Sequence, residues 1–299
     1  MEQQYNVVIG GGIAGLVWAM YHPDYHVLTD KIGGQFSASF QLGPKYLHKT
    51  LKTEKFLQDI GADDIKTKII RVGFYIDRRI RDINTEENRR IYFEKTRGLS
   101  GSETYRSTMS GGDTEFEVFD IDVEQLINLL YERVKEKVII DKIKSIDLAT
   151  KYLVGESNQE CRFDSLVITV PRPVFCFMIE QFEEAKKFVS YPTTFIRAKE
   201  LPGVIDVSDE EFAPYDYVYF SQQNYAFHRI TRIQNGEYCV ELKGDNIPTQ
   251  VYETERFVLK IGQLVQRQDT IEYPDFVKFF GRYAQWNHGI KTKELLEEC

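Results

Sequence analysis

The sequence has few cysteines, no excess of positive charge and no repeats, and each absence narrows the possible functions. Its four cysteines, Cys161, Cys176, Cys239 and Cys299, lie far apart and form no Cys-x-x-Cys or metal-ligand spacing. We therefore predict reduced, mainly buried thiols and no metal site. The net charge of −8, from 38 basic and 46 acidic residues, argues against a broad surface for nucleic acid.

The sequence also lacks an apolar run long enough to span a membrane. The first predicted strand starts almost at Met1, which leaves no room for a signal peptide. We therefore expect a cytoplasmic protein without membrane contact. With 299 residues, 42% of them hydrophobic, the chain can bury a large core in one composite domain or two closely packed lobes. The sequence predicts no oligomeric state.

The first thirty residues carry the strongest pattern. Residues 7–9 are a short apolar run typical of a buried parallel strand, and residues 16–21 are typical of an apolar helix. A glycine-rich turn joins them, and residues 25–29 predict a second strand that ends at Asp30. Strand, glycine turn, helix, strand and acid, in this order, indicate a dinucleotide-binding βαβ unit.

The glycines of the turn have separate physical roles in such a unit. Gly10 permits the tight turn, Gly12 lets a pyrophosphate approach the backbone, and Gly15 lets the helix pack on the strand. The N–H groups at the start of the helix then face the phosphates. Asp30 stands where an acid accepts hydrogen bonds from an adenosine ribose. The alternative is a glycine-rich turn that binds no ligand.

Further along the chain the patterns predict alternating helices and strands. Helices are expected at residues 51–60, 122–137 and 248–266, the last with Val251, Phe257, Val258, Ile261 and Leu264 facing the core. Strands or hairpin arms are expected at residues 68–82, 138–140, 143–146, 152–154, 163–170, 191–200, 216–220, 226–233 and 237–243. Residues 98–114 are a long polar loop, either disordered or a mobile lid.

The motifs resemble those of the UDP-galactopyranose mutase and flavin amine oxidase superfamily. The resemblance rests on "GGGIAG" from Gly10, "DKIGGQ" from Asp30, "GPKYLHKT" from Gly43, and a terminal "GRYAQW" from Gly281. It implies FAD as the cofactor. It also implies that His48 and Lys45 face the flavin, Lys45 replacing a histidine of the family, and we predict both as catalytic residues.

The resemblance also assigns roles to two arginines. Arg229 lies in a stretch that resembles the mutase segment whose arginine binds the diphosphate of a sugar nucleotide, and we predict it as a third catalytic residue. The alternative is that Arg229 and Arg232 are paired surface residues. Arg282 would neutralise the FAD pyrophosphate, and residues 286–292 would present helix-start N–H groups to the flavin. The arginines at 78, 79, 81, 89 and 90 are a possible anion patch, although a solvated charged face explains them better.

Motif and resemblance together predict a broad set of cofactor-binding residues. They are Gly10, Gly12, Ile13, Ala14, Gly15, Asp30, Lys31, Gly34, Gln35, Gly43, Pro44, Tyr46, Leu47, Ile139, Thr169, Pro171, Gly281, Arg282, Trp286, Asn287 and His288.

The predicted fold class is α/β, with a Rossmann-like FAD-binding domain built on a parallel sheet and a smaller mixed β-sheet substrate lobe. The FAD-binding domain takes residues 1–67, 118–174 and 271–299. The substrate lobe takes residues 68–117, a hairpin and a Ser/Gly loop, and residues 175–270. The chain is shorter than the mutases it resembles, and the region of their helical substrate domain is reduced.

Three functions follow as hypotheses. The first is an FAD-dependent oxidoreductase of the amine oxidase type, acting on a small or nucleotide-linked substrate. The second is a mutase-like, flavin-dependent isomerase of a sugar nucleotide. The third is a noncatalytic flavoprotein. The reduced substrate region favours the oxidoreductase, whereas the segment around Arg229 favours the isomerase.

Overall fold

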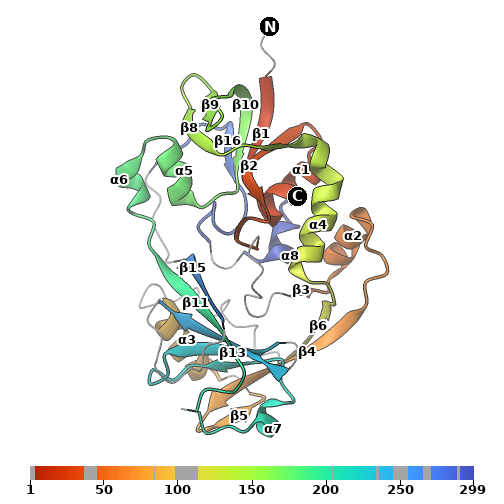
Figure 1. Cartoon of the computed structure of the whole chain (residues 1–299), viewed down its shortest axis with the longest axis vertical. Coiled ribbons are helices and arrows are strands. Elements are labelled where there is room, and N and C mark those ends of the chain that lie inside the picture. Colours follow the sequence, from red (N-terminus) through yellow and green to blue (C-terminus); the bar gives the residue numbers. More distant parts are fainter. Residues whose placement is uncertain are drawn as a thin grey trace.

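The computed structural model describes residues 4–36, 46–83, 85–97, 114–203, 205–233, 236–244, 255–264, 271–287 and 290–299. Among these residues, no helix has the length and apolar character needed to cross a membrane. Figure 1 shows two sheets, one in the upper and one in the lower part of the molecule, with β3 and α8 between them.

The first sheet, as far as the structure describes it, has seven strands in the order β7-β2-β1-β10-β9-β8, with β16 paired to β10. Its strands are β1 (Gln4–Gly11), β2 (Tyr25–Ile32), β7 (Val138–Ile140), β8 (Ile143–Asp147), β9 (Tyr152–Gly155), β10 (Glu160–Ile168) and β16 (Val277–Phe279). Strands β7, β2, β1, β10 and β16 are parallel, whereas β8 and β9 form an antiparallel extension. The carboxyl ends of β1, β2, β10 and β16 therefore meet at one edge, where such sheets bind ligands.

Helices cover both faces of this sheet because its core strands are apolar on both sides. Val8 and Val27 face a core shared with α1 (Ile13–Tyr21), α2 (Leu51–Asp59), α4 (Val123–Val134) and α8 (Thr292–Leu295). Val7 and Ile9 face the opposite core, which contains Phe175 of α5 (Arg172–Met178). The short α6 (Phe182–Ala185) follows α5, and η3 (Lys135–Lys137) follows α4. This two-sided burial explains the continuous apolar runs in the sequence.

The second sheet is mixed and has nine strands among the described residues, in the order β15-β11-β14-β13-β12-β4-β6-β3, with β5 paired to β4. Among the strand pairs that the structure describes, β12 and β4 are the parallel pair and the others are antiparallel. The strands are β3 (Leu47–His48), β4 (Thr67–Ile76), β5 (Arg79–Arg81), β6 (Glu115–Phe119), β11 (Ser190–Ala198), β12 (Tyr217–Phe220), β13 (Phe227–Arg232), β14 (Tyr238–Lys243) and β15 (Glu255–Leu264).

The two faces of the mixed sheet have different neighbours. Val218 and Phe220 of β12 point to a core that includes Phe212 of α7 (Asp209–Phe212). Tyr217 and Tyr219 point to the other face, against Tyr92 of α3 (Glu86–Arg97). Alternation along β12 thus separates an aliphatic and aromatic core from a tyrosine-rich face.

The helix predicted at residues 248–266 is wrong, because β15 is an edge strand paired antiparallel with β11. Phe257 and Leu259 pack near Phe195 of β11, whereas Arg256 and Lys260 are exposed. This alternation has the two-residue period of a strand, which the helical interpretation overlooked. Residues 248–254, 265 and 266 lie outside the described part of the chain.

Two differences concern helix positions. Helix α3 was not predicted, although Thr85 precedes Glu86 and Glu87 in the first turn, and the side chains of Arg90 and Glu94 form an ion pair one turn apart. The helix expected to start near residue 286 begins only at Thr292. The predicted helices near residues 51–60 and 122–137 and the predicted strands are confirmed.

Candidate functional site

The glycine turn between β1 and α1 leaves room for a ligand. A Cβ on Gly15 would overlap the carbonyl oxygen of Gly10, so only glycine lets α1 pack this closely on β1. A Cβ on Gly12, in contrast, would meet only the Cα of Gly34, at 4.0 Å, among the described atoms. Gly12 is the N-cap of α1 and has no side chain to cap it, and the first turn has no acidic residue. The first N–H groups of α1 therefore remain for an anion or for water.

The second glycine pair packs directly on this turn. The N–H of Gly33 donates to the carbonyl oxygen of Gly11 at 2.8 Å. Gly34, with a φ of +56°, starts the 3-10 helix η1 (Gly34–Phe36), and a Cβ there would stand 3.3 Å from the Cα of Gly12. Asp30 and Lys31 precede the pair and are exposed at the end of β2. The two glycine motifs thus form the two sides of one cradle.

The C-terminal segment reaches the same cradle. Gly281, with a φ of +90°, follows β16, and a Cβ on it would lie 2.8 Å from the Cβ of Ala14 in the first turn of α1. Arg282 is half-buried, its Nε donates to the carbonyl oxygen of Ile290 at 2.9 Å, and burial lowers its pKa. Tyr283 is hydrogen-bonded to Gln35 and Arg282; burial raises its pKa, and the charge of Arg282 opposes this.

The face of the mixed sheet that carries Tyr217 and Tyr219 borders this cradle. Phe36 of η1 packs with Phe195 and Cys239 of the sheet. The ring of Tyr46 stacks on that of Tyr217, with centroids 6.2 Å apart. Burial raises the pKa of both phenols, so both are neutral hydrogen-bonding groups. Aromatic side chains from β12 and from the segment before β3 therefore gather on the face of the mixed sheet against which Phe36 of η1 packs.

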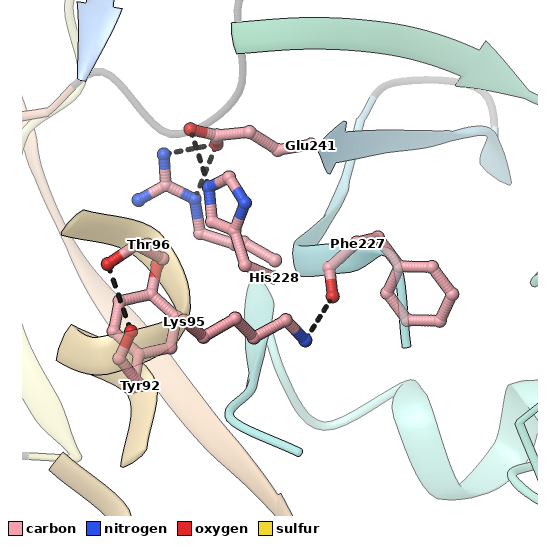
Figure 2. A network of polar contacts seen from close by, with 7 residues as sticks. Tyr92, Lys95, Thr96, Phe227, His228 and Glu241 are labelled. Atoms are coloured by element: carbon pink, nitrogen blue, oxygen red, sulfur yellow. Dashed lines mark hydrogen bonds and ion pairs between the residues drawn. The ribbon is translucent and has the colours of Figure 1, made fainter. Parts of the chain in front are cut away.

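Arg229 lies on this face at a β-bulge in β13. The register with β14 pairs Phe227 with Leu242 and Arg229 with Glu241, so His228 is the extra residue. The bulge turns both His228 and Arg229 toward Glu241. The Nε and Nη2 of Arg229 donate to Oε2 of Glu241, the first at 2.8 Å. Nε2 of His228 lies 3.2 Å from Oε1 of Glu241, and Figure 2 shows these two side chains together. Arg229 is therefore in a half-buried ion pair within the site, rather than paired with Arg232 on the surface.

Electrostatics fix the protonation of this group. Burial alone would lower the pKa of Arg229, but Glu241 and the neighbouring tyrosines raise it well above its usual value. Burial lowers the pKa of His228 despite the nearby Glu241. Arg229 is thus charged and His228 neutral near pH 7.

Lys95 of α3 supports the bulge and was missed by the sequence analysis. Its Nζ donates to the carbonyl oxygens of Phe220, Gln222 and Phe227, at 2.8, 2.7 and 2.7 Å. Figure 2 shows the last of these bonds, at the residue just before His228. Lys95 thus satisfies the carbonyl just before the bulge and two carbonyls at and just after the end of β12. The signal that could have found it is the apolar face of α3, which buries Tyr92, Phe93 and Thr96.

His48 lies on β3, next to α8. Its ring stacks on Phe116 with centroids 4.6 Å apart, and its backbone carbonyl accepts a 2.7 Å bond from Thr53 Oγ1. Burial, with the charges of Lys291 and Lys293, lowers its pKa to about 4. His48 is therefore a neutral, half-buried imidazole near pH 7.

The remaining predicted residues are placed as follows. Ile13 and Leu47 contribute to the core around α1, and Ile139 lies on β7. Thr169 donates through Oγ1 to the carbonyl of Ile9 at 2.8 Å, which ties β10 to the glycine turn, and Pro171 is the N-cap of α5. Trp286 packs its ring on Phe188, and the N–H of Asn287 donates to the carbonyl of Arg282. Gly43, Pro44, Lys45, His288 and the loop at 98–113 lie outside the described residues.

Comparisons with known proteins agree with this architecture. No protein-family model matches the sequence, and no curated protein matches it. Among solved structures, reduced UDP-galactopyranose mutase is similar with a TM-score of 0.66 and 12% identity, covering 98% of this chain and 93% of that one. An oxidoreductase from Methanosarcina mazei has a TM-score of 0.62 and 10% identity, covering 98% of each chain. Putrescine oxidase bound to putrescine has a TM-score of 0.62 and 7% identity, covering 100% and 98%.

The chain therefore has the α/β fold of these proteins, and the predicted fold class is confirmed. The resemblance to the mutase and amine oxidase superfamily is likewise confirmed as a likeness of fold. At 7–12% identity, the likeness establishes the fold and leaves the activity to the chemistry of the site.

Proposed function

We propose that this chain is an FAD-binding enzyme. The observation that carries the proposal is the contact between Gly12 and Gly34, because two glycine motifs meet there around space that any side chain would fill. Gly12, Gly15 and the start of α1 would hold the pyrophosphate, Asp30 the ribose, and Gly281 and Arg282 the opposite side. When bound, FAD would supply two-electron redox chemistry.

The activity we favour is that of an oxidoreductase acting on a small or nucleotide-linked substrate. The tyrosine-rich face would exclude water and orient the substrate through Tyr46, Tyr217 and Tyr219. His48 would act as a neutral hydrogen-bonding group, and Lys45 stays a predicted cation of the same segment. Putrescine oxidase and the Methanosarcina oxidoreductase are similar in fold, which supports this choice.

A mutase-like isomerase is the second candidate. Arg229 favours it, because a guanidinium on the face opposite the glycine cradle stands where a diphosphate could be bound. The similarity to UDP-galactopyranose mutase supports the same choice.

We also propose the domain division expected from the sequence, with residues 1–67, 118–174 and 271–299 as the cofactor-binding part. Residues 68–117 and 175–270 would be the substrate lobe. This division runs through the mixed sheet, because β3 belongs to the cofactor-binding part and pairs there with Val118 and Phe119 at the end of β6.

One experiment tests both the cofactor and the class of reaction. One portion of the purified protein is heated, and the released flavin is identified as FAD. A second, unheated portion is saturated with FAD and screened with substrates in the oxidised and the dithionite-reduced state. Bleaching of the flavin by an amine or another donor supports the oxidoreductase. Turnover of UDP-galactopyranose only after reduction supports the isomerase. If heating releases no FAD and added FAD does not shift the melting temperature of the protein, the proposal that the chain binds FAD is refuted.

A further inference from the structure

The β-bulge in β13 makes Arg229 part of a built charge pair. Without the bulge, His228 and Arg229 would point to opposite faces of the sheet; with it, both meet the one carboxylate of Glu241. Lys95 holds the bulge from α3 through the carbonyl of Phe227 (Figure 2). Helix α3 and the bulged strand β13, which lie far apart in the sequence, thus together stabilise the pairing of Arg229 with Glu241.

The pairing uses one of the two edges through which the guanidinium of Arg229 can bind an anion. Nε and Nη2 form the side of a guanidinium that binds carboxylates and phosphates in a bidentate manner. Here both donate to Oε2 of Glu241, and Glu241 is only 4% exposed. A ligand anion that used this edge of the guanidinium would have to displace a buried carboxylate, which would then lose its partner.

The charges lead to the same conclusion. An anion beside Arg229 would also stand beside Glu241, and at similar distances attraction and repulsion cancel. Other cations face the pair, but each has other partners. Lys95 donates to three carbonyl oxygens, and Arg282 donates to Ile290. Lys291 acts on Arg229 from the side of α8, with Glu294 beside it.

We propose that Glu241 is a specificity-determining residue that occupies Arg229 and makes this face of the site select an uncharged, hydrogen-bonding substrate over a nucleoside diphosphate. The inference rests on the proposed flavoenzyme site and names its substrate class. Tyr46, Tyr217 and Tyr219 provide apolar ring surface and neutral hydroxyl groups for such a molecule. The proposed role of Glu241 also favours the oxidoreductase over the sugar-nucleotide isomerase.

In the test, FAD-saturated protein is titrated with UDP, and binding is measured by the heat of binding and by the change in flavin absorption. Wild type should bind UDP more weakly than about 1 mM, and Glu241→Gln should bind it about tenfold or more tightly than wild type. Glu255→Gln is the matched control, since Glu255 pairs with Arg197 at 3.0 Å on the same sheet, and it should bind like wild type. Micromolar binding by wild type that Arg229→Gln abolishes would overturn the proposal, as would unchanged UDP affinity in a folded Glu241→Gln.

Glu241→Gln leaves the half-buried Arg229 without a charged partner, and this variant could fail to fold. The wild-type and Arg229→Gln titrations need no such variant, and micromolar binding that depends on Arg229 would still overturn the proposal. If the protein binds no FAD, the flavoenzyme proposal fails separately. In that case UDP is titrated into Gly12→Val, whose turn has no room for a phosphate, so that any UDP binding reports on the face that carries Arg229. The outcomes named above then support or overturn the proposal in the same way.

Discussion

Gly34 lies directly against Gly12, so that a Cβ on Gly34 would stand 3.3 Å from the Cα of Gly12. These residues belong to the two glycine motifs, one before α1 and one after β2. Because β1 and β2 are parallel neighbours, their carboxyl ends place both motifs at the same edge of the sheet. The cradle is thus a consequence of the strand order.

Substitution of Gly12 by valine should abolish FAD binding. The branched side chain would fill the space between Gly12 and Gly34, while the φ of −79° at Gly12 is accessible to any residue. The fold should therefore persist. Fluorescence titration with FAD checks the affinity, and circular dichroism checks the fold. Gly203→Val is the control, since no atom lies within 4 Å of its Cβ position, and it should bind FAD normally. Full FAD affinity in Gly12→Val would show that the cofactor does not pass this turn.

Arg282→Ala should weaken FAD binding about ten- to hundredfold, because a charge-assisted hydrogen bond to phosphate contributes about 1.5–3 kcal/mol. The variant also loses the bond to the Ile290 carbonyl, so its stability is measured alongside. Arg282→Lys, which keeps the charge, should recover part of the affinity. Unchanged FAD affinity in a folded Arg282→Ala would remove the C-terminal segment from the cofactor site.

The βαβ unit could be predicted because its signals are local. Apolar runs at residues 7–9 and 25–29, with glycines at fixed spacing between them, report the strands and the turn directly. The edge strand β15 was mistaken for a helix, because its partner β11 lies far away in the sequence. In a segment of ten residues that is rich in apolar side chains, the two-residue period of a strand is easily confused with the period of a helix.

The Arg229–Glu241 pair could not be predicted from the arginine alone. It depends on the register of two strands, and a one-residue change in register would place the side chains on opposite faces. The bulge does leave a trace, because two polar residues, His228 and Arg229, interrupt the alternation between Phe227 and Ile230. The role of these two polar residues becomes clear only once the positions of Lys95 and Glu241 around the bulge are known.

His48 should titrate far below ordinary histidines. Its pKa is lowered to about 4 by burial and by Lys291 and Lys293, against an ordinary value of 6.5. Between these values the unfolded chain binds the proton and the folded protein does not, so stability falls as pH drops from 6.5 toward 4. After allowance for screening at this half-buried site, the change is about 1–2 kcal/mol.

His48→Gln should remove this part of the pH dependence, as measured by urea unfolding at pH 4.5 and 7. His22→Gln is the control, since His22 is half-exposed and stacks on Trp18 away from β3. His48→Ala should also alter the absorption of bound flavin. An imidazole NMR titration with a midpoint near 6.5 for His48 would contradict its placement beside α8.

Lys95 should give a pH dependence of the same sign as His48, but on the alkaline side. Burial lowers its pKa to about 7, against an ordinary value of 10.5. Between these values the unfolded chain holds the proton that the folded protein releases, so the free energy of unfolding rises with pH. From pH 7 to pH 9 this contributes about 2 kcal/mol, and Lys95→Met should lack it. The control is Lys137→Met, since Lys137 donates to a single carbonyl, that of Ala19 at 3.3 Å, and it should keep the wild-type slope. Urea unfolding of the three proteins at pH 6, 7.5 and 9 makes the comparison. A wild-type slope in Lys95→Met would mean that Lys95 stays protonated in the folded protein and that its three carbonyl acceptors outweigh the cost of its burial.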